Sequence, residues 1–163
     1  MQFLQHFCEM LYQSGFGTML RESNNAFSVI ESIHVLSITL LVGTIAILDL
    51  RMLGLILRSV SVSRLARSVL PLSWSGFAVS VTSGFLLFWS EAAKMYVNPS
   101  FRAKLVLLVL AGFNALIFHT TVYHRAQEWE TLPVCPWRAR VNAIASLALW
   151  GGAIIAGRAI AYF

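Results

Sequence analysis

Four long apolar runs limit what this chain can fold into more than any other feature of its sequence. The runs cover approximately residues 26–48, 69–89, 103–123 and 141–162. Each has about 20 residues or more, which is the length that a helix rising about 1.5 Å per residue needs to cross a ~30 Å hydrocarbon core. The sequence therefore predicts an all-α integral membrane protein in which residues 1–163 form one domain, a four-helix bundle.

The balance of apolar and charged residues indicates that lipid, and not water, surrounds most of the chain. Apolar residues make up 58% of the sequence and charged residues 12%, whereas a soluble domain carries about 25% charged residues. The net charge of +5 could suggest nucleic acid. The basic residues lie at the ends of the apolar runs, however, where Lys and Arg orient helices against anionic head groups. We therefore expect membrane lipid, and no nucleic acid, among the partners.

The first 20 residues predict an amphipathic helix that lies in the membrane interface, because their apolar side chains share one helical face. Those side chains are Phe3, Leu4, Phe7, Cys8 and Leu11. We expect the glycines after residue 14 to end this helix and Ser23 to cap the next one. The first membrane helix is expected to continue to about Leu57, and Pro71 is expected in the first turn of the second.

The arginines predict an orientation in the membrane. Seven of them flank or occupy the loops after the first and third runs: Arg51, Arg58, Arg64, Arg67, Arg125, Arg138 and Arg140. The other side has five basic residues, Arg21, Lys94, Arg102, Lys104 and Arg158. Because cytoplasmic loops are enriched in Lys and Arg, we expect both termini on the outer, periplasmic side. Cys8 and Cys135 then lie on opposite faces of the membrane and cannot form an intrachain disulfide.

Small residues predict which helix faces touch. Ser73, Gly76, Ser80, Ser83 and Leu87 form one stripe in the second run. Asn142, Ser146, Ala153 and Gly157 form another in the fourth. Small side chains let helices approach closely where lipid provides no hydrophobic driving force between them.

Ionisable side chains inside the predicted spans are the candidates for function, because each costs several kcal/mol unless it is paired. The outer half contains Glu31, His34 and Arg158, and the inner half contains Asp49, Arg51 and His119, with Asn114 nearer the middle. A neutral imidazole inside a bundle is a ligand for haem iron, and an arginine can meet a haem propionate. We therefore predict haem b, with His34 and His119 as candidate iron ligands and Arg158 as a propionate partner.

The depths of the two histidines argue against a single haem between them. Measured from the outer end, His34 lies a few residues inside its span and His119 about fifteen residues beyond Lys104, so the two imidazoles differ in depth by about 15 Å. Two separate sites, each with a sixth ligand from His6, a methionine, another subunit or solvent, would remove this difficulty. The alternative is structural: His34 bonds a neighbouring helix, Glu31 pairs with Arg158, and the remaining polar residues form a network.

In that network we expect Asp49 to meet His119 or Arg67, and Arg51 to extend towards the cytoplasm. Asp49 and Arg51 are two residues apart, so they point to different sides of the helix and each needs its own partner.

Several segments resemble a family of bacterial four-helix inner-membrane proteins that is known only as a domain of unknown function. The segments are Glu31-Ser-Ile-His34-Val-Leu, Gly43 to Asp49-Leu-Arg51-Met-Leu-Gly54, Lys104 to Gly112-Phe-Asn114 with Phe118-His119, and Gly157-Arg158-Ala-Ile-Ala-Tyr162. The resemblance extends from about residue 20 to the end and implies this architecture and a bacterial inner membrane, but no reaction. A looser similarity to small b-type cytochromes and copper-resistance-D-like membrane proteins rests on the membrane histidines.

Three functional hypotheses follow. The first is a haem-b electron-transfer protein or subunit that exchanges electrons with quinone or with a partner at the outer face. The second is a cofactor-free anchor or assembly subunit of a larger complex or homo-oligomer. The third is a small transporter or proton-conducting module that uses Glu31, Asp49 and the histidines. Neither a Ser/His/Asp arrangement nor a phosphate-binding glycine loop supports a hydrolase or a kinase, and the sequence leaves open whether the chain is an enzyme.

Overall fold

The computed structural model describes residues 2–123 and 135–162. Every regular element in these two ranges is helical, which confirms the all-α prediction. In chain order the elements are α1 (Gln2–Gln13), α2 (Gly15–Glu22), α3 (Asn24–Met52), α4 (Val62–Ser90), α5 (Ala92–Val97), α6 (Pro99–Ile117), the π-helical turn η1 (Phe118–Val122) and α8 (Trp137–Ala159).

Four of the helices in the described ranges are long and apolar enough to cross a membrane, as predicted. They are Asn25–Met52, Val62–Ser90, Pro99–Thr121 and Trp137–Ala159. Many of their large apolar side chains are exposed in the isolated chain, among them Leu36, Phe85 and Ile155. This exposure suits helices whose outer faces contact lipid, because lipid tails are as apolar as the side chains themselves.

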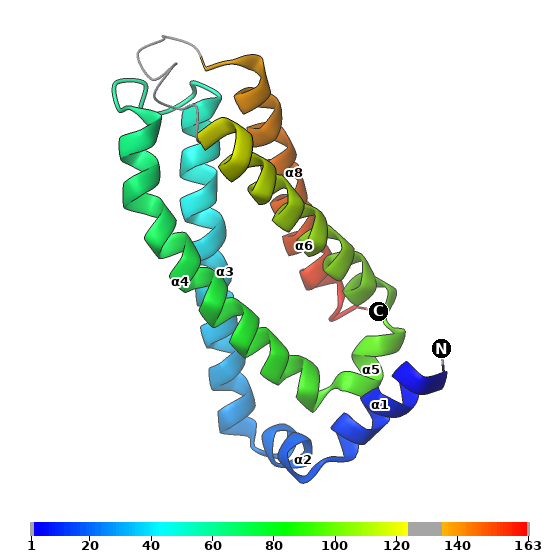
Figure 1. Cartoon of the computed structure of the whole chain (residues 1–163). Coiled ribbons are helices and arrows are strands. Elements are labelled where there is room, and N and C mark those ends of the chain that lie inside the picture. The colour runs from blue at the N-terminus through cyan, green and yellow to red at the C-terminus, as the bar shows by residue number, and fades with distance from the viewer. Residues whose placement is uncertain (1, 124–134, 163) are drawn as a thin grey trace.

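The four long helices form two hairpins, α3–α4 and α6–α8. Figure 1 shows the hairpins meeting at the end where the 53–61 loop lies and diverging towards the other end. The beginning of α1 and the end of α8 both lie at that other end, where α1, α2 and α5 cross beneath the long helices (Figure 1). We call the first end the loop end and the second the terminal end.

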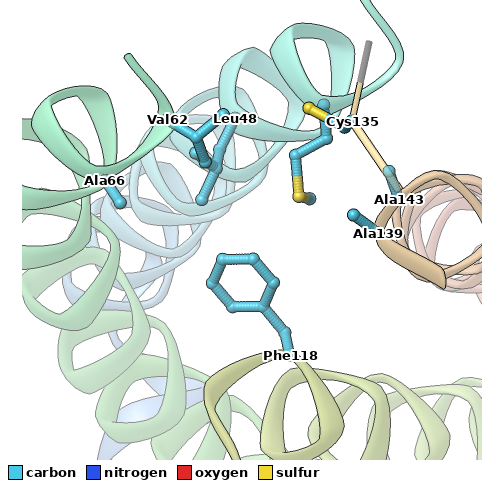
Figure 2. Packing of buried hydrophobic residues seen from close by; sticks show 8 residues of the cluster. Leu48, Val62, Ala66, Phe118, Cys135, Ala139 and Ala143 are labelled. Atoms are coloured by element: carbon cyan, nitrogen blue, oxygen red, sulfur yellow. The ribbon is translucent and has the colours of Figure 1, made fainter. Parts of the chain in front are cut away.

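The hairpins are joined at the loop end by a cluster of buried side chains, shown in Figure 2 and called the junction below. Its members come from α3, α4, the end of α6 and the start of α8: Leu48, Met52, Val62, Ala66, Phe118, Cys135, Ala139 and Ala143. Phe118 extends from one hairpin towards the side chains of the other (Figure 2). At the terminal end the Phe88 and Phe101 rings stack with their centroids 5.4 Å apart, which connects α4 with α6.

Short polar side chains set where the helices begin. Ser23 Oγ accepts a hydrogen bond from the Ala26 amide at the start of α3, and Ser61 Oγ accepts one from Arg64 at the start of α4. Asn98 Oδ1 accepts from the amides of Ser100 and Phe101, and Pro99 occupies the first position of α6. Each cap satisfies amides that have no partner within the helix.

Two expectations about helix ends are wrong. Helix α3 ends at Met52 and not near Leu57, because Gly54 adopts a φ of +73° and Leu57 a φ of 49°, which a right-handed helix does not allow. Pro71 lies in the interior of α4 and not in its first turn. The Ser61 cap starts the helix about two turns earlier than hydropathy suggested, and Pro71 then lacks the amide that would bond the carbonyl one turn back.

The N-terminal segment forms two helices rather than one, divided at Ser14. The apolar face expected on α1 is also divided, because Cys8 and Leu11 are buried against α4 and α5 while Phe3 and Phe7 are exposed.

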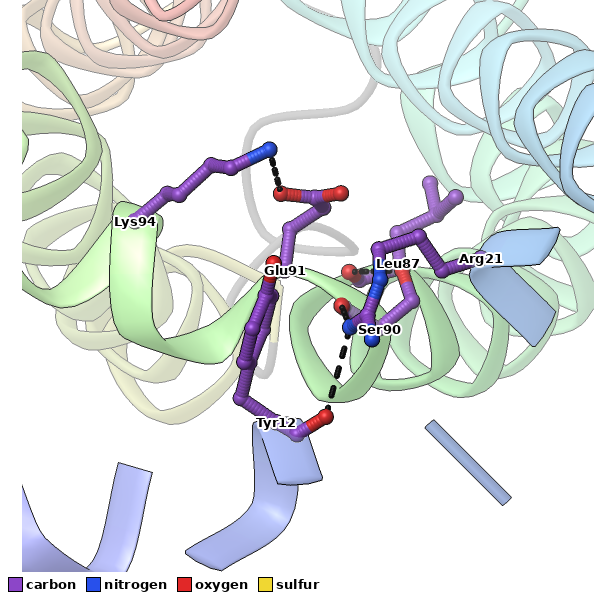
Figure 3. Close-up of polar contacts among 6 residues, drawn as sticks. All are labelled: Tyr12, Arg21, Leu87, Ser90, Glu91 and Lys94. Atoms are coloured by element: carbon purple, nitrogen blue, oxygen red, sulfur yellow. Dashed lines mark hydrogen bonds and ion pairs between the residues drawn. The ribbon is translucent and has the colours of Figure 1, made fainter. Parts of the chain in front are cut away.

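A group of hydrogen bonds ties the N-terminal helices to the end of α4, as Figure 3 shows. Arg21 of α2 donates to the carbonyl oxygens of Tyr12 and Ser90, and its guanidinium lies 4.0 Å from the Tyr12 ring centroid. The Trp89 indole donates to Ser14 Oγ at 2.9 Å, and Glu91 pairs with Lys94 at 2.8 Å.

Candidate functional site

The candidate site is centred on His34, which lies where α3 packs against α4. This seam is formed by the first predicted small-residue stripe, in which Ser73, Gly76 and Ser83 are buried. His34 is half-buried, and its Nδ1 lies 3.0 Å from Ser83 Oγ. The imidazole therefore does connect two helices, as the structural alternative expected.

Hydrogen bonding around Ser83 indicates which nitrogen of His34 carries the proton. Ser83 Oγ lies 2.6 Å from the Val79 carbonyl oxygen, which can only accept, so the single hydroxyl proton is used there. Ser83 Oγ then accepts from His34, and Nδ1 is the protonated nitrogen. The Ser80 carbonyl lies beside the same ring and 3.3 Å from Ser83 Oγ. In a neutral imidazole this tautomer leaves a lone pair on Nε2.

Gly84 brings the imidazole close to the backbone of α4. A Cβ atom at this position would lie 2.8 Å from His34 Cε1, which is closer than two carbon atoms can approach. Any larger residue at position 84 would displace the ring from the Ser83 hydroxyl. The sequence shows Gly84 only as one of several small residues, and it contains no sign that a histidine on another helix needs this space.

Lys104 is the charged residue that the structure adds to the site. It comes from α6, is half-buried, and interacts electrostatically with His34. Its Nζ lies 3.5 Å from where a Cβ on Gly157 of α8 would stand, so the glycine leaves room for the amine. Within the described ranges no ion pair or hydrogen bond neutralises this lysine. Its place as the sixth residue of α6, directly before a long apolar run, is the signal that could have revealed it.

Arg158 and Glu31 lie apart from this group. Both side chains are exposed, and the Arg158 guanidinium lies 5.6 Å from the Tyr162 ring centroid. The described part of the chain has no ion pair between Glu31 and Arg158, so that expectation is wrong.

His119 lies at the opposite end of the bundle. It belongs to the π-helical turn η1, where its ring packs edge-on against Phe118 and Tyr123. It is fifteen residues beyond Lys104 along the same helix, which corresponds to about 22 Å. One haem therefore cannot join His34 to His119 in this structure.

The inner polar residues form two hydrogen-bonded groups. Asn114 of α6 and Asn142 of α8 exchange side-chain bonds, with Asn142 Nδ2 donating to Asn114 Oδ1 at 2.8 Å and each amide donating to the other residue's carbonyl. One turn along α8, the Ser146 hydroxyl meets the Asp49 carboxyl from α3. These contacts connect α3, α6 and α8 next to the junction.

Asp49 and Arg51 have separate partners, as their spacing predicts, but the partner of Asp49 and the direction of Arg51 differ from those expected. In the described ranges Asp49 contacts neither His119 nor the exposed Arg67. Arg51 is 6% exposed and does not extend towards solvent. It donates to the carbonyl oxygens of Val60 and Arg58 and so fixes the 53–61 loop.

The surroundings of His34 could provide one haem ligand and do not form a cage of ligands. Nowhere in residues 2–123 and 135–162 do three His, Cys, Asp or Glu side chains gather as a metal site would require. With Nδ1 donating to Ser83 Oγ, the lone pair of a neutral His34 lies on Nε2, and a metal-bound histidine commonly donates its other N–H to an oxygen in this way. Among the groups described, Lys104 is the cation that interacts electrostatically with His34.

The fold and these polar groups define a multi-span α-helical membrane protein with a half-buried histidine in the seam between α3 and α4. The chain belongs to the DUF6644 family, a family of unknown function whose sequence profile matches residues 12–163. This confirms the resemblance to an uncharacterised family. Neither a curated protein nor a solved structure matches the chain significantly.

Proposed function

We propose that this protein is a bacterial inner-membrane electron-transfer protein, or a subunit of one, that binds haem b through His34. The observation that carries the proposal is the hydrogen bond of 3.0 Å between His34 Nδ1 and Ser83 Oγ. A serine oxygen that accepts from Nδ1 fixes both the tautomer and the ring orientation, which are the two properties an axial ligand needs.

Lys104 supports the proposal because it provides a positive charge inside the bundle near His34. A haem carries two propionates, and a cation near them would offset the cost of placing a carboxylate in the membrane. Arg158, the partner expected from the sequence, faces outward and would need another subunit to share the same group. His119 lies at the loop end and is not part of this proposed site.

The chain's own residues would hold and tune the group. Ser83 orients the imidazole, Gly84 admits it to the seam, and Lys104 supplies the charge. Bound haem supplies a one-electron couple, which the protein adjusts through the axial ligand, its hydrogen bond and the polarity around it. The described part of the chain has no large extramembrane domain. We therefore expect the haem to exchange electrons with a quinone in the membrane or with a partner at the terminal end.

We further propose that the loop end faces the cytoplasm. Arg58 in the 53–61 loop and the flanking Arg51, Arg64 and Arg67 support this orientation, because cytoplasmic loops are enriched in basic residues. In a background without Cys8 and Cys135, a thiol reagent that cannot cross membranes should label Ser59→Cys in inverted vesicles and Lys94→Cys in right-side-out vesicles. The reverse pattern would contradict the orientation and leave the haem proposal unaffected.

A cofactor-free anchor or assembly subunit is the second candidate, and one observation favours it. Both hydrogen-bonding groups beside the His34 ring come from α4, so the histidine can act as a link between two helices without any ligand. In that case the exposed apolar faces of the spans would contact a larger membrane complex.

Absorption spectra of the detergent-purified protein from haem-replete cells, oxidised and dithionite-reduced, test the proposal. We expect a Soret band and reduced α and β bands that His34→Ala abolishes. His119→Ala is the matched control, because it removes the same side chain at the loop end and should leave this spectrum intact. Ser83→Ala should keep the haem but shift its midpoint potential, since the bond to Nδ1 is lost.

A spectrum without haem bands would refute the proposal and favour the anchor. Bands that survive His34→Ala and disappear in His119→Ala would move the site to the loop end and refute the role of His34.

A further inference from the structure

A second polar site lies at the junction, away from His34, and it is centred on Asp49. This side chain is 3% exposed and lies within the α3 membrane span. Its neighbours along the helix, Leu48 and Met52, belong to the junction. An ionised carboxylate in such a place costs several kcal/mol unless a cation or several donors compensate it.

The hydrogen bonds to Asp49 do not compensate fully for the burial of an ionised carboxylate. The Ser146 hydroxyl meets the carboxyl group, but Asp49 Oδ2 is buried and has no hydrogen-bond partner among residues 2–123 and 135–162. Native proteins rarely leave a buried polar atom without a partner, so each such atom needs an explanation. If a proton binds to Oδ2, this oxygen becomes the hydroxyl group of a carboxylic acid. The neutral acid then needs no counter-charge.

The charged and titratable groups on the surrounding elements do not supply that counter-charge. On α3, Arg51 donates to loop carbonyls, and on α4 Arg64 and Arg67 are exposed. After α6, the rings of His119 and Tyr123 pack against each other. Near α8, Cys135 and Arg140 lie beside each other, and Cys135 bonds Arg51. None of these groups forms an ion pair or hydrogen bond with Asp49 in the described ranges.

We propose that Asp49 is a proton-binding site, carried as a neutral carboxylic acid while the junction between the hairpins is closed. The proton comes from water when the junction opens and returns to water when Asp49 ionises. Because the closed junction holds the acid and an open one would admit water to the carboxylate, proton binding and closure favour each other. This inference does not rest on the proposed haem site.

A metal cation suits the site less well than a proton. Metal ions that prefer oxygen take several ligands, about six to eight for calcium. The described residues offer the Asp49 carboxyl and the Ser146 hydroxyl here, because the Asn114 and Asn142 side chains bond each other. A proton needs one oxygen atom only.

The composition of the chain allows a direct test, because Asp49 is its only aspartate. Cell-free synthesis with carboxyl-carbon-13 aspartate labels this one carboxyl group in the full-length protein, without haem. Infrared spectra in nanodiscs at neutral pH should contain a carbonyl stretch of a protonated acid that moves to lower frequency with the label. Raising the pH should replace it with carboxylate stretches.

Ser146→Ala should shift the labelled acid band to higher frequency, because the acid loses its hydrogen bond. Ser68→Ala is the control, since that exposed hydroxyl bonds its own helix and should leave the band in place. A labelled group that shows only carboxylate stretches at neutral pH would overturn the proposal. Carboxylate stretches that respond to sodium would also overturn it and identify a cation site instead. An acid band that both variants leave unmoved would place Asp49 outside this junction and overturn the proposal as well.

Discussion

The approach of His34 to Gly84 gives the sharpest prediction about stability. An added Cβ at position 84 would lie 2.8 Å from His34 Cε1, whereas carbon atoms in good contact are about 3.5–4.0 Å apart. The imidazole can avoid the methyl group by rotating, but rotation breaks its bond of 3.0 Å to Ser83. We therefore expect Gly84→Ala to destabilise the α3–α4 hairpin.

The magnitude follows from the two consequences of rotation. A lost hydrogen bond costs about 0.5–1.5 kcal/mol, and a side chain forced from its preferred rotamer costs a similar amount. The sum is about 1–3 kcal/mol. Replacing a helical glycine with alanine also adds up to about 1 kcal/mol of helix propensity, which must be subtracted. Gly43→Ala measures this term alone, because a Cβ there would have no neighbour within 4 Å.

Reversible unfolding in mixed detergent micelles provides the assay. We expect the free energy of unfolding of Gly84→Ala to lie about 1–3 kcal/mol below that of Gly43→Ala. Gly84→Ala should also lower the haem content if His34 is the ligand. Equal stabilities of the two variants would refute the reasoning, because they would show that the imidazole does not pack on Gly84.

Three further predictions concern other parts of the structure. Gly76→Ala should reduce stability relative to Gly43→Ala by about 1–3 kcal/mol in the same unfolding assay, because its Cβ would meet backbone atoms of α3 at 3.0–3.2 Å that cannot rotate away; equal stabilities would contradict close packing of this seam. A double-mutant cycle on Asn114→Ala and Asn142→Ala should give a coupling energy of about 0.6 kcal/mol and at most about 1.7 kcal/mol, the range for polar pairs between membrane helices. Burial raises the pKa of the Cys135 thiol, so less of the reactive thiolate is present at neutral pH. Alkylation of folded Cys135 should therefore be slower than that of the unfolded chain at pH 7 and should accelerate as the pH rises towards the raised pKa; equal rates at pH 7 would contradict this environment.

Some residues of the candidate site could be predicted from the sequence, and others could not. His34, Asp49 and Asn114 were found because a polar or ionisable residue in an apolar run is unusual wherever it points. Their partners Ser83 and Asn142 were placed in stripes of small residues, which indicates a helix contact but does not say which helix lies opposite. Lys104 was counted among the flanking basic residues, because its depth depends on where Asn98 and Pro99 start the helix.

The wrong expectations have a common cause. Pairing Glu31 with Arg158, or Asp49 with His119, assumed that residues at similar depth meet. Depth fixes one coordinate of a side chain, whereas the rotation of each helix about its axis fixes the direction. Arg158 turns outward beside Tyr162, while Lys104 turns towards His34.

The sequence by itself determined the class of structure. A run of about 20 apolar residues has one low-energy arrangement in a bilayer, a helix that satisfies its own backbone hydrogen bonds, so the four helices follow from composition and length. Helices that are apolar on all sides carry little periodic signal about which face turns inward. Only the tertiary structure decided that His34 bonds Ser83, that Lys104 acts on His34 electrostatically, and that Asp49 meets Ser146, because these interactions depend on how far and at what angle the helices approach each other.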